Sequence, residues 1–308
     1  MRWSYSGSRT FKKCQRQWYF KNIVAHAKAK DPVRHRAYLL SKLQSVSAWR
    51  GQIVDDVISK VIVPGVNRRS PVTLRDAKAL ARDQYERQLD FALDHPINHP
   101  DLRVSDEGED FCLLYGMEYD SPPSEEELEQ AWREVEQALT NLYSMDAIRT
   151  TLKTSEFVAA QRPLHLSLID GVAAVAIPDV IAFHKTTSPT IIDWKVHAFG
   201  ENDAWLQLAI YAIALSQSKH KDFPTDFRCT ADQVRLLEVQ LLTGLVREHR
   251  PDLEQIEDAH DYAVDSAYEM HCLVDGRKNV DIGLDDLLTA LSEETCQTCQ
   301  FRSLCWSK

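Results

Sequence analysis

The sequence lacks the features that mark several large classes of protein. No stretch approaches the roughly 18 consecutive apolar residues of a membrane-spanning helix, and the opening residues contain no apolar run typical of a secretory signal. No segment matches the G-x-x-x-x-G-K-[ST] phosphate loop, and we find no internal repeat or low-complexity tract. We therefore expect a cytoplasmic protein with no membrane partner and no ATP-driven motor. Any helicase activity would have to come from a separate protein partner.

The composition is that of an ordinary globular chain. Its 308 residues are 44% hydrophobic and 27% charged, which suits one large domain or two modest ones of roughly 100–200 residues each. Seven cysteines are present. In a reducing compartment they are poor candidates for a disulfide framework, so ligation of a metal or cluster is the better interpretation of any that are grouped.

Charge is unevenly distributed along the chain. The net charge of −10 argues against general adhesion to nucleic acid, but residues 1–50 carry twelve Lys or Arg against one acid, Asp31. Residues 101–137 carry thirteen acids against Arg103 and Arg133. The basic arm also contains aromatic residues, which would suit contact with phosphates and stacking on bases: Trp3, Tyr5, Trp18, Tyr19 and Phe20. Alternatively, the two regions pair with each other or are simply solvated faces.

Hydrophobic spacing divides the chain into four parts. Residues 1–62 would hold the basic arm and a first core helix over 35–62, interrupted only at Gly51. Residues 63–155 would form an acidic helical lobe with helices over 73–94, where Thr73 is a plausible N-cap, and over 121–144. A core over 156–250 and a C-terminal helix with the cysteine cluster over 251–308 would complete the chain.

The expected core begins with strands. Segments 164–169, 174–184 and 190–196 read as a three-stranded meander, followed by an apolar helix over 204–215, a strand over 234–242 and a helix over 253–274. We therefore predict an α/β fold with a central mixed sheet flanked by helices.

Acidic residues and a lysine gather in this region. In TIIDWKV, Asp193 and Lys195 are two apart on a strand, so they share one face while Trp194 points to the other. If the hairpin turns about Thr187, residue 179 lies opposite 195, which brings Asp179 to the same face. Such oxygen ligands suit Mg²⁺ or Mn²⁺, with Lys195 orienting or deprotonating a water. The alternative is a pair of strand-end acids bridged by a surface lysine.

The helix that follows adds two polar residues on one face. Gln207 and Tyr211 are four apart in an otherwise apolar segment, and buried amides and phenols must find partners. We expect this pair to point at a polar site. A core glutamine bonded to backbone is the alternative.

These segments resemble a known family. The run IPDVIAFHKTTSPTIIDWKVHAFGENDAWLQLAIYA is similar to the core of PD-(D/E)XK nucleases of the RecB-like branch, with its hydrophobic-PD element, acidic-x-Lys strand and Q-x-x-x-Y helix in order. The opening SYSGSRTFKKCQRQWYF and the closing CQTCQFRSLC resemble the iron-sulfur members of that branch, of the AddB and CRISPR-adaptation type. The resemblance runs from about residue 3 to 305 and is weakest over the acidic lobe.

The resemblance implies a restriction-endonuclease-like core and roles for particular residues. Asp179 and Asp193 would be metal ligands, Lys195 the catalytic lysine and the Trp194 carbonyl a further ligand. Gln207 and Tyr211 would position and contact DNA. The branch usually has Gly-x-x-x-His on its first core helix, whereas this chain reads Gly51-Gln52-Ile53-Val54-Asp55. A carboxylate ligates Mg²⁺ or Mn²⁺ well, so Asp55 is the candidate third ligand, with Asp56 the less favoured neighbour.

The cysteines form a second candidate site. The spacing C-x2-C-x5-C of Cys296, Cys299 and Cys305 lets them bind one inorganic centre at little loop-closure cost. The resemblance implies Cys14 as the fourth ligand of a [4Fe–4S] cluster, in a subdomain that joins both chain ends. Spacing alone leaves tetrahedral Zn²⁺ open. We expect Cys112, Cys229 and Cys272 to be small buried hydrophobes.

Taken together, the sequence predicts a metal-dependent deoxyribonuclease acting on single-stranded DNA or duplex ends, in repair, recombination or defence. The alternative is a weak or inactive nucleic-acid-binding scaffold subunit, which the Asp at position 55 would suit. Because Asp179, Asp193, Lys195 and Gln207 are all present together, the enzyme is the preferred interpretation.

Overall fold

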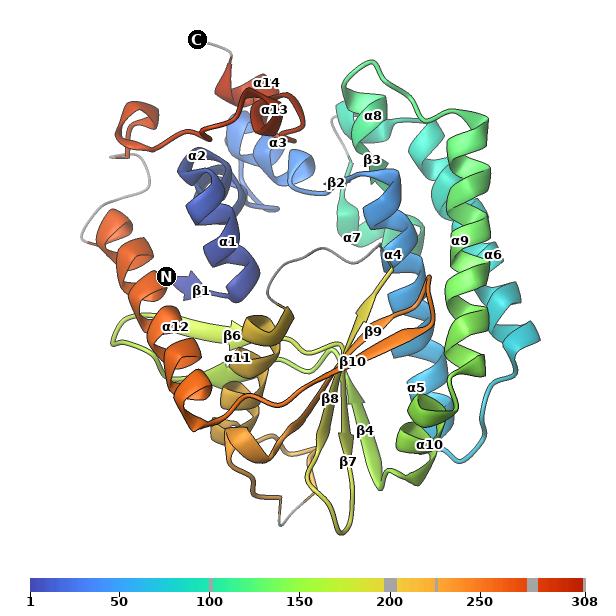
Figure 1. Ribbon diagram of the computed structural model, residues 1–308. Coiled ribbons are helices and arrows are strands. Elements are labelled where there is room, and N and C mark those ends of the chain that lie inside the picture. Colours follow the sequence, from blue (N-terminus) through green and yellow to red (C-terminus); the bar gives the residue numbers. More distant parts are fainter. Residues whose placement is uncertain (100–101, 197–203, 225–226, 276–281, 307–308) are drawn as a thin grey trace.

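A computed structural model describes residues 1–99, 102–196, 204–224, 227–275 and 282–306 of the protein (Figure 1). The helices are α1 (Tyr5–Lys13), α2 (Gln15–Tyr19), α3 (Pro32–Leu40), α4 (Val46–Val57), α5 (Val63–Asn67), α6 (Leu74–Leu93), α7 (Val104–Glu107), α8 (Tyr115–Glu118), α9 (Glu125–Ser144), α10 (Asp146–Thr154), α11 (Ala204–Gln217), α12 (Leu253–Val274), α13 (Glu293–Gln297) and α14 (Arg302–Cys305). The strands are β1 (Arg2–Trp3), β2 (Leu43–Gln44), β3 (Leu113–Leu114), β4 (Phe157–Ala160), β5 (Leu164–Leu166), β6 (Ala173–Ala176), β7 (Val180–Phe183), β8 (Thr190–Lys195), β9 (Arg235–Gln240) and β10 (Leu245–His249).

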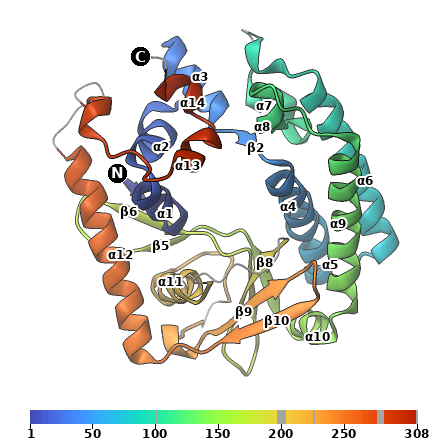
Figure 2. The same cartoon turned by 45° about the horizontal axis from the view of Figure 1, so that its top comes forward.

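A five-stranded mixed sheet lies at the centre of the fold. Its strand order within the described residues is β10-β9-β8-β7-β4, with β8 parallel to β9 and antiparallel to β7. Helices α11 and α12 lie on one side of this sheet, and α4 and α9 lie on the other (Figures 1 and 2). The expectation of an α/β fold with a mixed sheet flanked by helices is confirmed. No helix in the described part of the chain is long and apolar enough to cross a membrane.

The expected three-stranded meander is wrong. Segment 174–184 forms two strands, because β6 ends at Ala176 and β7 begins at Val180. Pro178 lies between them and has no N–H to donate to a strand ladder. Strand β6 pairs with β1 and β5 in a separate three-stranded sheet, whereas β7 pairs with β8. Asp179 therefore lies directly before β7, where the chain enters the central sheet. Strands β1, β4 and β10 were not expected from the sequence.

The register of the β7–β8 hairpin also differs from the expected one. Val180 pairs with Ile192 and Ile181 with Ile191, which places Asp179 beside Asp193 rather than opposite Lys195. The difference is two residues. Because side chains alternate along a strand, a shift of two keeps them on the same face. The prediction of a shared face for the two acids and the lysine therefore survives the error in register.

The segment expected to be one helix over 35–62 is broken. Helix α3 ends at Leu40, residues Leu43–Gln44 pair in parallel with Leu113–Leu114, and α4 begins at Val46. The Ser45 hydroxyl accepts a hydrogen bond from the Ala48 N–H and starts the new helix. Gly51, the expected interruption, lies inside α4. The helices expected over 73–94, 121–144 and 253–274 are present as α6, α9 and α12, and Thr73 caps α6 as predicted.

The aromatic residues of the basic arm form core. Trp3 and Trp18 are fully buried, and Tyr5, Tyr19 and Phe20 are at most 8% exposed. The Trp3 indole N–H donates to the Ser266 hydroxyl, and the Ser8 hydroxyl bonds to the same oxygen, which fixes α1 against α12. The expectation that these rings stack on bases is therefore wrong. Four of the rings pack in the hydrophobic cluster that includes residues of α11 and α12, and Phe20 packs on Phe301 in a separate cluster.

Candidate functional site

The predicted acidic site lies where β7 and β8 adjoin under α11. Asp193 is 3% exposed, and its carboxylate lies 2.6 Å from the Lys195 ammonium. The Asp179 carboxylate accepts a hydrogen bond of 2.8 Å from the Trp194 backbone N–H. Trp194 packs its indole in the cluster on the α4 side of the sheet, opposite Asp193, as the alternation predicted. The role of its carbonyl as a ligand stays a prediction.

Helix α4 brings the third carboxylate to this region. Asp56 is occupied by the Gln84 amide at 2.8 Å and by Lys60 at 3.0 Å, in contacts that join α4 to α6 and to its own next turn. Asp55 instead accepts a hydrogen bond from the Gln161 side-chain amide. The two neighbours therefore have different partners, and the contact with Gln161 directs Asp55 toward the sheet.

Gln161 was not foreseen from the sequence. It follows β4 with a positive φ of 50°, and its backbone N–H donates to the Asp179 carbonyl at 2.9 Å while its side chain reaches Asp55. It therefore joins two of the three carboxylate residues. Positive φ is uncommon outside glycine and is retained where the surroundings demand it. No recognisable motif surrounds this glutamine, so only the fold could reveal it.

The three carboxylates interact electrostatically. Burial, and then the charges of Asp193 and Asp55, hold the pKa of Asp179 well above its ordinary value. Burial, followed by the charges of Asp56 and Asp193, raises the pKa of Asp55 to about 6. Mutual repulsion of this kind is relieved by a nearby cation. The donor set therefore fits a hard divalent ion, although no three His, Cys, Asp or Glu side chains in the described ranges are already close enough to enclose one.

A fourth buried carboxylate extends the polar face of the sheet. Glu238 of β9 is 3% exposed and lies in register with Asp193. Its oxygens contact the Gln240 amide at 2.9 Å and the His249 ring at 3.1 Å. In the sequence, Glu238 is an acidic residue at a core position of VRLLEVQLL. Assigning this segment to a strand did not by itself indicate a functional residue. These contacts satisfy Glu238 within the sheet, so it supports the site from one side.

Gln207 and Tyr211 lie together on α11, as predicted. The Gln207 amide donates to the Tyr211 hydroxyl at 2.5 Å. Burial, and then the charges of Asp193 and Asp179, raise the pKa of Tyr211, so its hydroxyl keeps its proton. Both residues line a cavity of about 320 Å³ together with Arg2, Ser4 and Ser6 of the N-terminal segment. The pair thus connects the carboxylates to an open polar cavity.

The four predicted cysteines meet at one place. Cys14, Cys296, Cys299 and Cys305 all line a cavity of about 80 Å³ between α2 and the C-terminal helices. Hydrogen bonds hold the two chain ends together beside it: the Gln15 N–H donates to the Leu288 carbonyl at 3.0 Å, and its side-chain oxygen accepts from the Leu288 N–H at 2.9 Å. Phe20 stacks on Phe301 at the wall of the cavity.

The thiols influence one another's ionisation. Burial first, and then the neighbouring cysteines, raise the pKa of Cys299 to about 11 and also raise the pKa of Cys296. A cationic centre would lower these pKa values and favour the thiolates. Of the remaining cysteines, Cys112 is buried as expected, but Cys229 is half-buried and Cys272 is exposed, so the expectation was wrong for Cys272. Helix α12 presents Cys272 on its outer side.

Comparison with known proteins identifies the family. A model of the PD-(D/E)XK nuclease superfamily matches residues 2–306. No curated protein matches the chain. Among solved structures, that of SSO0001 is 14% identical, with a TM-score of 0.32, and the match covers 75% of this chain and 97% of that one. Protein VC1899 from Vibrio cholerae is 12% identical, with a TM-score of 0.26, and the match covers 74% of this chain and 61% of that one. The family model spans nearly the whole chain, and the chain therefore belongs to the PD-(D/E)XK nuclease superfamily.

Proposed function

We propose that this protein is a metal-dependent deoxyribonuclease whose site consists of Asp55, Asp179, Asp193 and Lys195. Members of the superfamily are generally nucleases, and they typically use Mg²⁺ or Mn²⁺. The observation that carries the proposal is the meeting of three mutually repelling carboxylates and one lysine at a single end of the sheet. A surface ion pair would need neither the burial of Asp193 nor the approach of Asp55.

The chain's own residues have distinct tasks in this proposal. A divalent cation held by Asp55, Asp179, Asp193 and the Trp194 carbonyl would supply charge to a phosphate oxygen and acidify a water. Lys195, now held by Asp193, would orient that water and accept or return its proton. The Trp194 N–H fixes the Asp179 carboxylate, and Gln161 fixes Asp55. Gln207 and protonated Tyr211 would hold the phosphate that follows or precedes the scissile one.

The substrate proposed is single-stranded DNA or a duplex end, with a role in repair, recombination or defence. An acidic chain with local basic regions guides one strand more readily than it coats long duplex. A separate helicase or other protein partner would open duplex substrates, because the sequence holds no phosphate loop.

We further propose that Cys14, Cys296, Cys299 and Cys305 hold a [4Fe–4S] cluster that fastens the two chain ends together. The four cysteines line one cavity of about 80 Å³, and the resemblance to the iron-sulfur members of the family favours a cluster over a single Zn²⁺. The set of four thiols satisfies either centre chemically. Iron and acid-labile sulfide analysis of anaerobically purified protein, beside zinc analysis, distinguishes them.

Cleavage of end-labelled single- and double-stranded DNA tests the proposed activity. Anaerobically purified, iron-quantified protein is compared with its Lys195→Ala variant in the presence of Mg²⁺ or Mn²⁺. We expect metal-dependent cutting by the parent protein alone, and the fragment ladder then gives the polarity. If the variant cuts equally well, or if the iron-loaded parent protein does not cut, the nuclease proposal is wrong. A nucleic-acid-binding scaffold subunit is then the better interpretation.

A further inference from the structure

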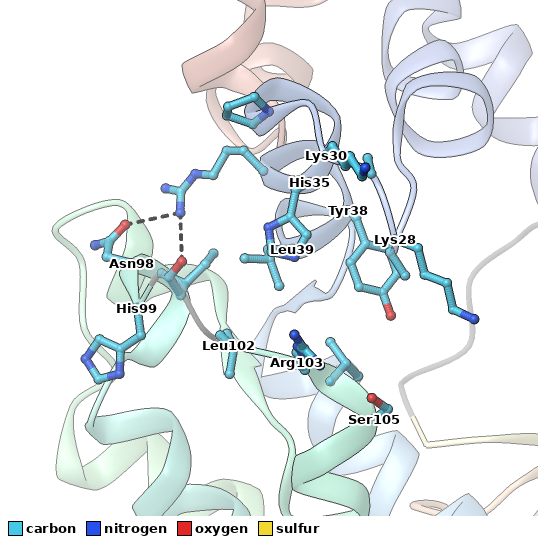
Figure 3. Close-up of a pocket in the computed structure, with 16 residues that line it drawn as sticks. Lys28, Lys30, His35, Tyr38, Leu39, Asn98, His99, Leu102, Arg103 and Ser105 are labelled. Atoms are coloured by element: carbon cyan, nitrogen blue, oxygen red, sulfur yellow. Dashed lines mark hydrogen bonds between the residues drawn. The ribbon is translucent and has the colours of Figure 1, made fainter.

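A second, larger cavity lies away from the carboxylates and is lined by cations. It has a volume of about 910 Å³ and lies between α3 with the residues before it and residues 97–99 and 102–105 (Figure 3). Lys28, Lys30, Arg36 and Arg103 line it together with His35 and His99. No Asp or Glu is among its described lining residues. In a chain with a net charge of −10, such a surface is selective for anions.

The walls of this cavity are fixed by a buried ion pair. Arg36 pairs with Glu118, whose side chain is 8% exposed, and also donates to the Ile97 carbonyl at 3.3 Å and the Asn98 side-chain oxygen at 3.1 Å. These contacts join α3 to the opposite wall (Figure 3). Arg36 therefore has a structural role. These contacts hold the two walls of the cavity in fixed relation.

Three other cations remain available to a ligand. Lys28, Lys30 and Arg103 are exposed and form no ion pair with any described residue. Tyr38 is half-buried, and its hydroxyl points into the same space between Lys28 and Arg103 (Figure 3). Several separated cations with an aromatic ring between them match phosphates spaced along a strand, with a base or sugar against the ring. A single phosphate would need neither the volume nor the spread of charge.

The cavity is connected to the catalytic region by one continuous stretch of chain. Helix α3 leads through β2 into α4, which carries Asp55. From Val46 to Asp55 helix α4 rises only about 14 Å at 1.5 Å per residue. A strand that occupies the cavity and continues along α4 would run toward the carboxylates.

We propose that the cavity between α3 and residues 97–99 and 102–105 binds a single nucleic-acid strand outside the catalytic site, through Lys28, Lys30, Arg103 and Tyr38. This inference rests on the proposed nuclease function and extends it, because it assigns the strand a second anchoring point. It also gives the acidic helical lobe a part in binding, since Arg103 belongs to it. The aromatic contact is Tyr38 instead of the buried rings of α1 and α2.

Fluorescence anisotropy tests this proposal without cleavage. Labelled strands of about 4 and about 16 nucleotides, a range typical of single-strand sites, are titrated into the Lys195→Ala protein. The same protein carrying Lys28→Glu, Lys30→Glu and Arg103→Glu is compared with a matched control carrying Arg75→Glu, Lys153→Glu and Lys221→Glu. The control residues are exposed, lie outside the cavity and give the same change in net charge.

We expect the cavity variant to bind the longer strand at least about tenfold more weakly at low salt, and the slope of log affinity against log salt to fall by about 2. The shorter strand and the control should change far less. The proposal is wrong if the cavity variant and the control bind the longer strand with equal affinity. It is also wrong if the cavity variant loses equal affinity for both lengths, or if the Lys195→Ala protein binds no strand. If charge reversal lowers the melting temperature, Arg103→Ala gives the same test with a slope change of about 0.7.

The two proposals fail separately. If the parent protein binds strands through the cavity but cuts no DNA with Mg²⁺, the strand-site proposal stands and the nuclease proposal is wrong. If a Lys28→Glu, Lys30→Glu, Arg103→Glu variant that retains Lys195 cuts with the same rate and salt dependence as the parent protein, the nuclease proposal stands and the strand site is wrong.

Discussion

The acidic site and the cysteine cavity both gather like charges, but they are built from different parts of the fold. The carboxylates stand on β8, α4 and the entry to β7, which are packed into the two largest hydrophobic clusters. Cys296 and Cys305 lie on the short helices α13 and α14, Cys14 caps α2 and Cys299 lies between α13 and α14. No residue of α13 or α14 is buried. The comparison indicates that packing of the core positions the carboxylates. The proposed centre would add to the few contacts that hold the chain ends together at the cysteine cavity.

The largest expected effect separates activity from stability at the acidic site. In Asp179→Asn the amide oxygen can still accept the Trp194 N–H, while one of three repelling charges is lost. We expect cleavage to fall by at least about 10²-fold. The melting temperature should be equal or higher, because repulsion is removed. Cleavage assays measure the activity and calorimetry measures the melting temperature. A variant that loses much stability but keeps its activity would show that Asp179 serves the fold and not the reaction.

The opposite pattern is expected at the cysteine cavity. Cys14→Ala should lose the iron and lower the melting temperature by about 10 °C or more, because a structural centre contributes folding free energy directly. The exposed Cys272→Ala is the matched control and should change neither. Metal analysis and thermal unfolding under anaerobic conditions provide the data. If Cys14→Ala keeps its full iron content and its melting temperature, Cys14 is not a ligand and the centre does not fasten the chain ends.

The dependence on pH should appear at the acidic site. Because the pKa of Asp55 is about 6, metal binding and cleavage should weaken as the pH falls through about 6 and this carboxylate protonates. The sign for the metal-free fold is opposite. A carboxyl whose pKa is raised from 3.8 binds more protons when folded, so stability should decrease as the pH rises from about 4 to about 6. Asp55→Asn should make this decrease smaller in a series of thermal melts, with the raised pKa of Asp179 accounting for the part that remains, whereas an unchanged series would refute the assignment.

The smallest expected effect concerns Gln161. Its amide lowers the pKa of Asp55, so Gln161→Ala should move the acidic limb of the pH–rate profile upward by about one unit. A conservative Gln161→Asn variant, whose side chain is shorter, should show the same direction. A profile that keeps its position while activity falls at all pH values would show that Gln161 acts only through packing.

Features that depend on residues close together in the sequence could be predicted from it. The shared face of Asp179, Asp193 and Lys195 follows from alternation along strands, and Gln207 with Tyr211 follows from helix spacing. The hairpin register was wrong by two residues, because the sequence of the 184–189 turn does not fix where pairing starts. Pro178 was a usable signal for the division between β6 and β7 that periodicity overrode.

Other features depend on partners far along the chain. Nothing near Trp3 or Ser8 indicates that they bond to Ser266, so the aromatic arm was taken for a binding surface. The contacts of Gln161 with Asp55 and Asp179, and the ion pair of Arg36 with Glu118, likewise join residues from separate elements. Such pairs arise only when the sheets and helices are assembled.

The most direct test of the central claim is calorimetric titration of Mn²⁺ alone into the parent protein and into Asp55→Asn, Asp179→Asn and Asp193→Asn. If the three carboxylates form one metal site, each variant should bind Mn²⁺ more weakly than the parent by at least about tenfold. Mn²⁺ binding that is the same in all four proteins would contradict the account.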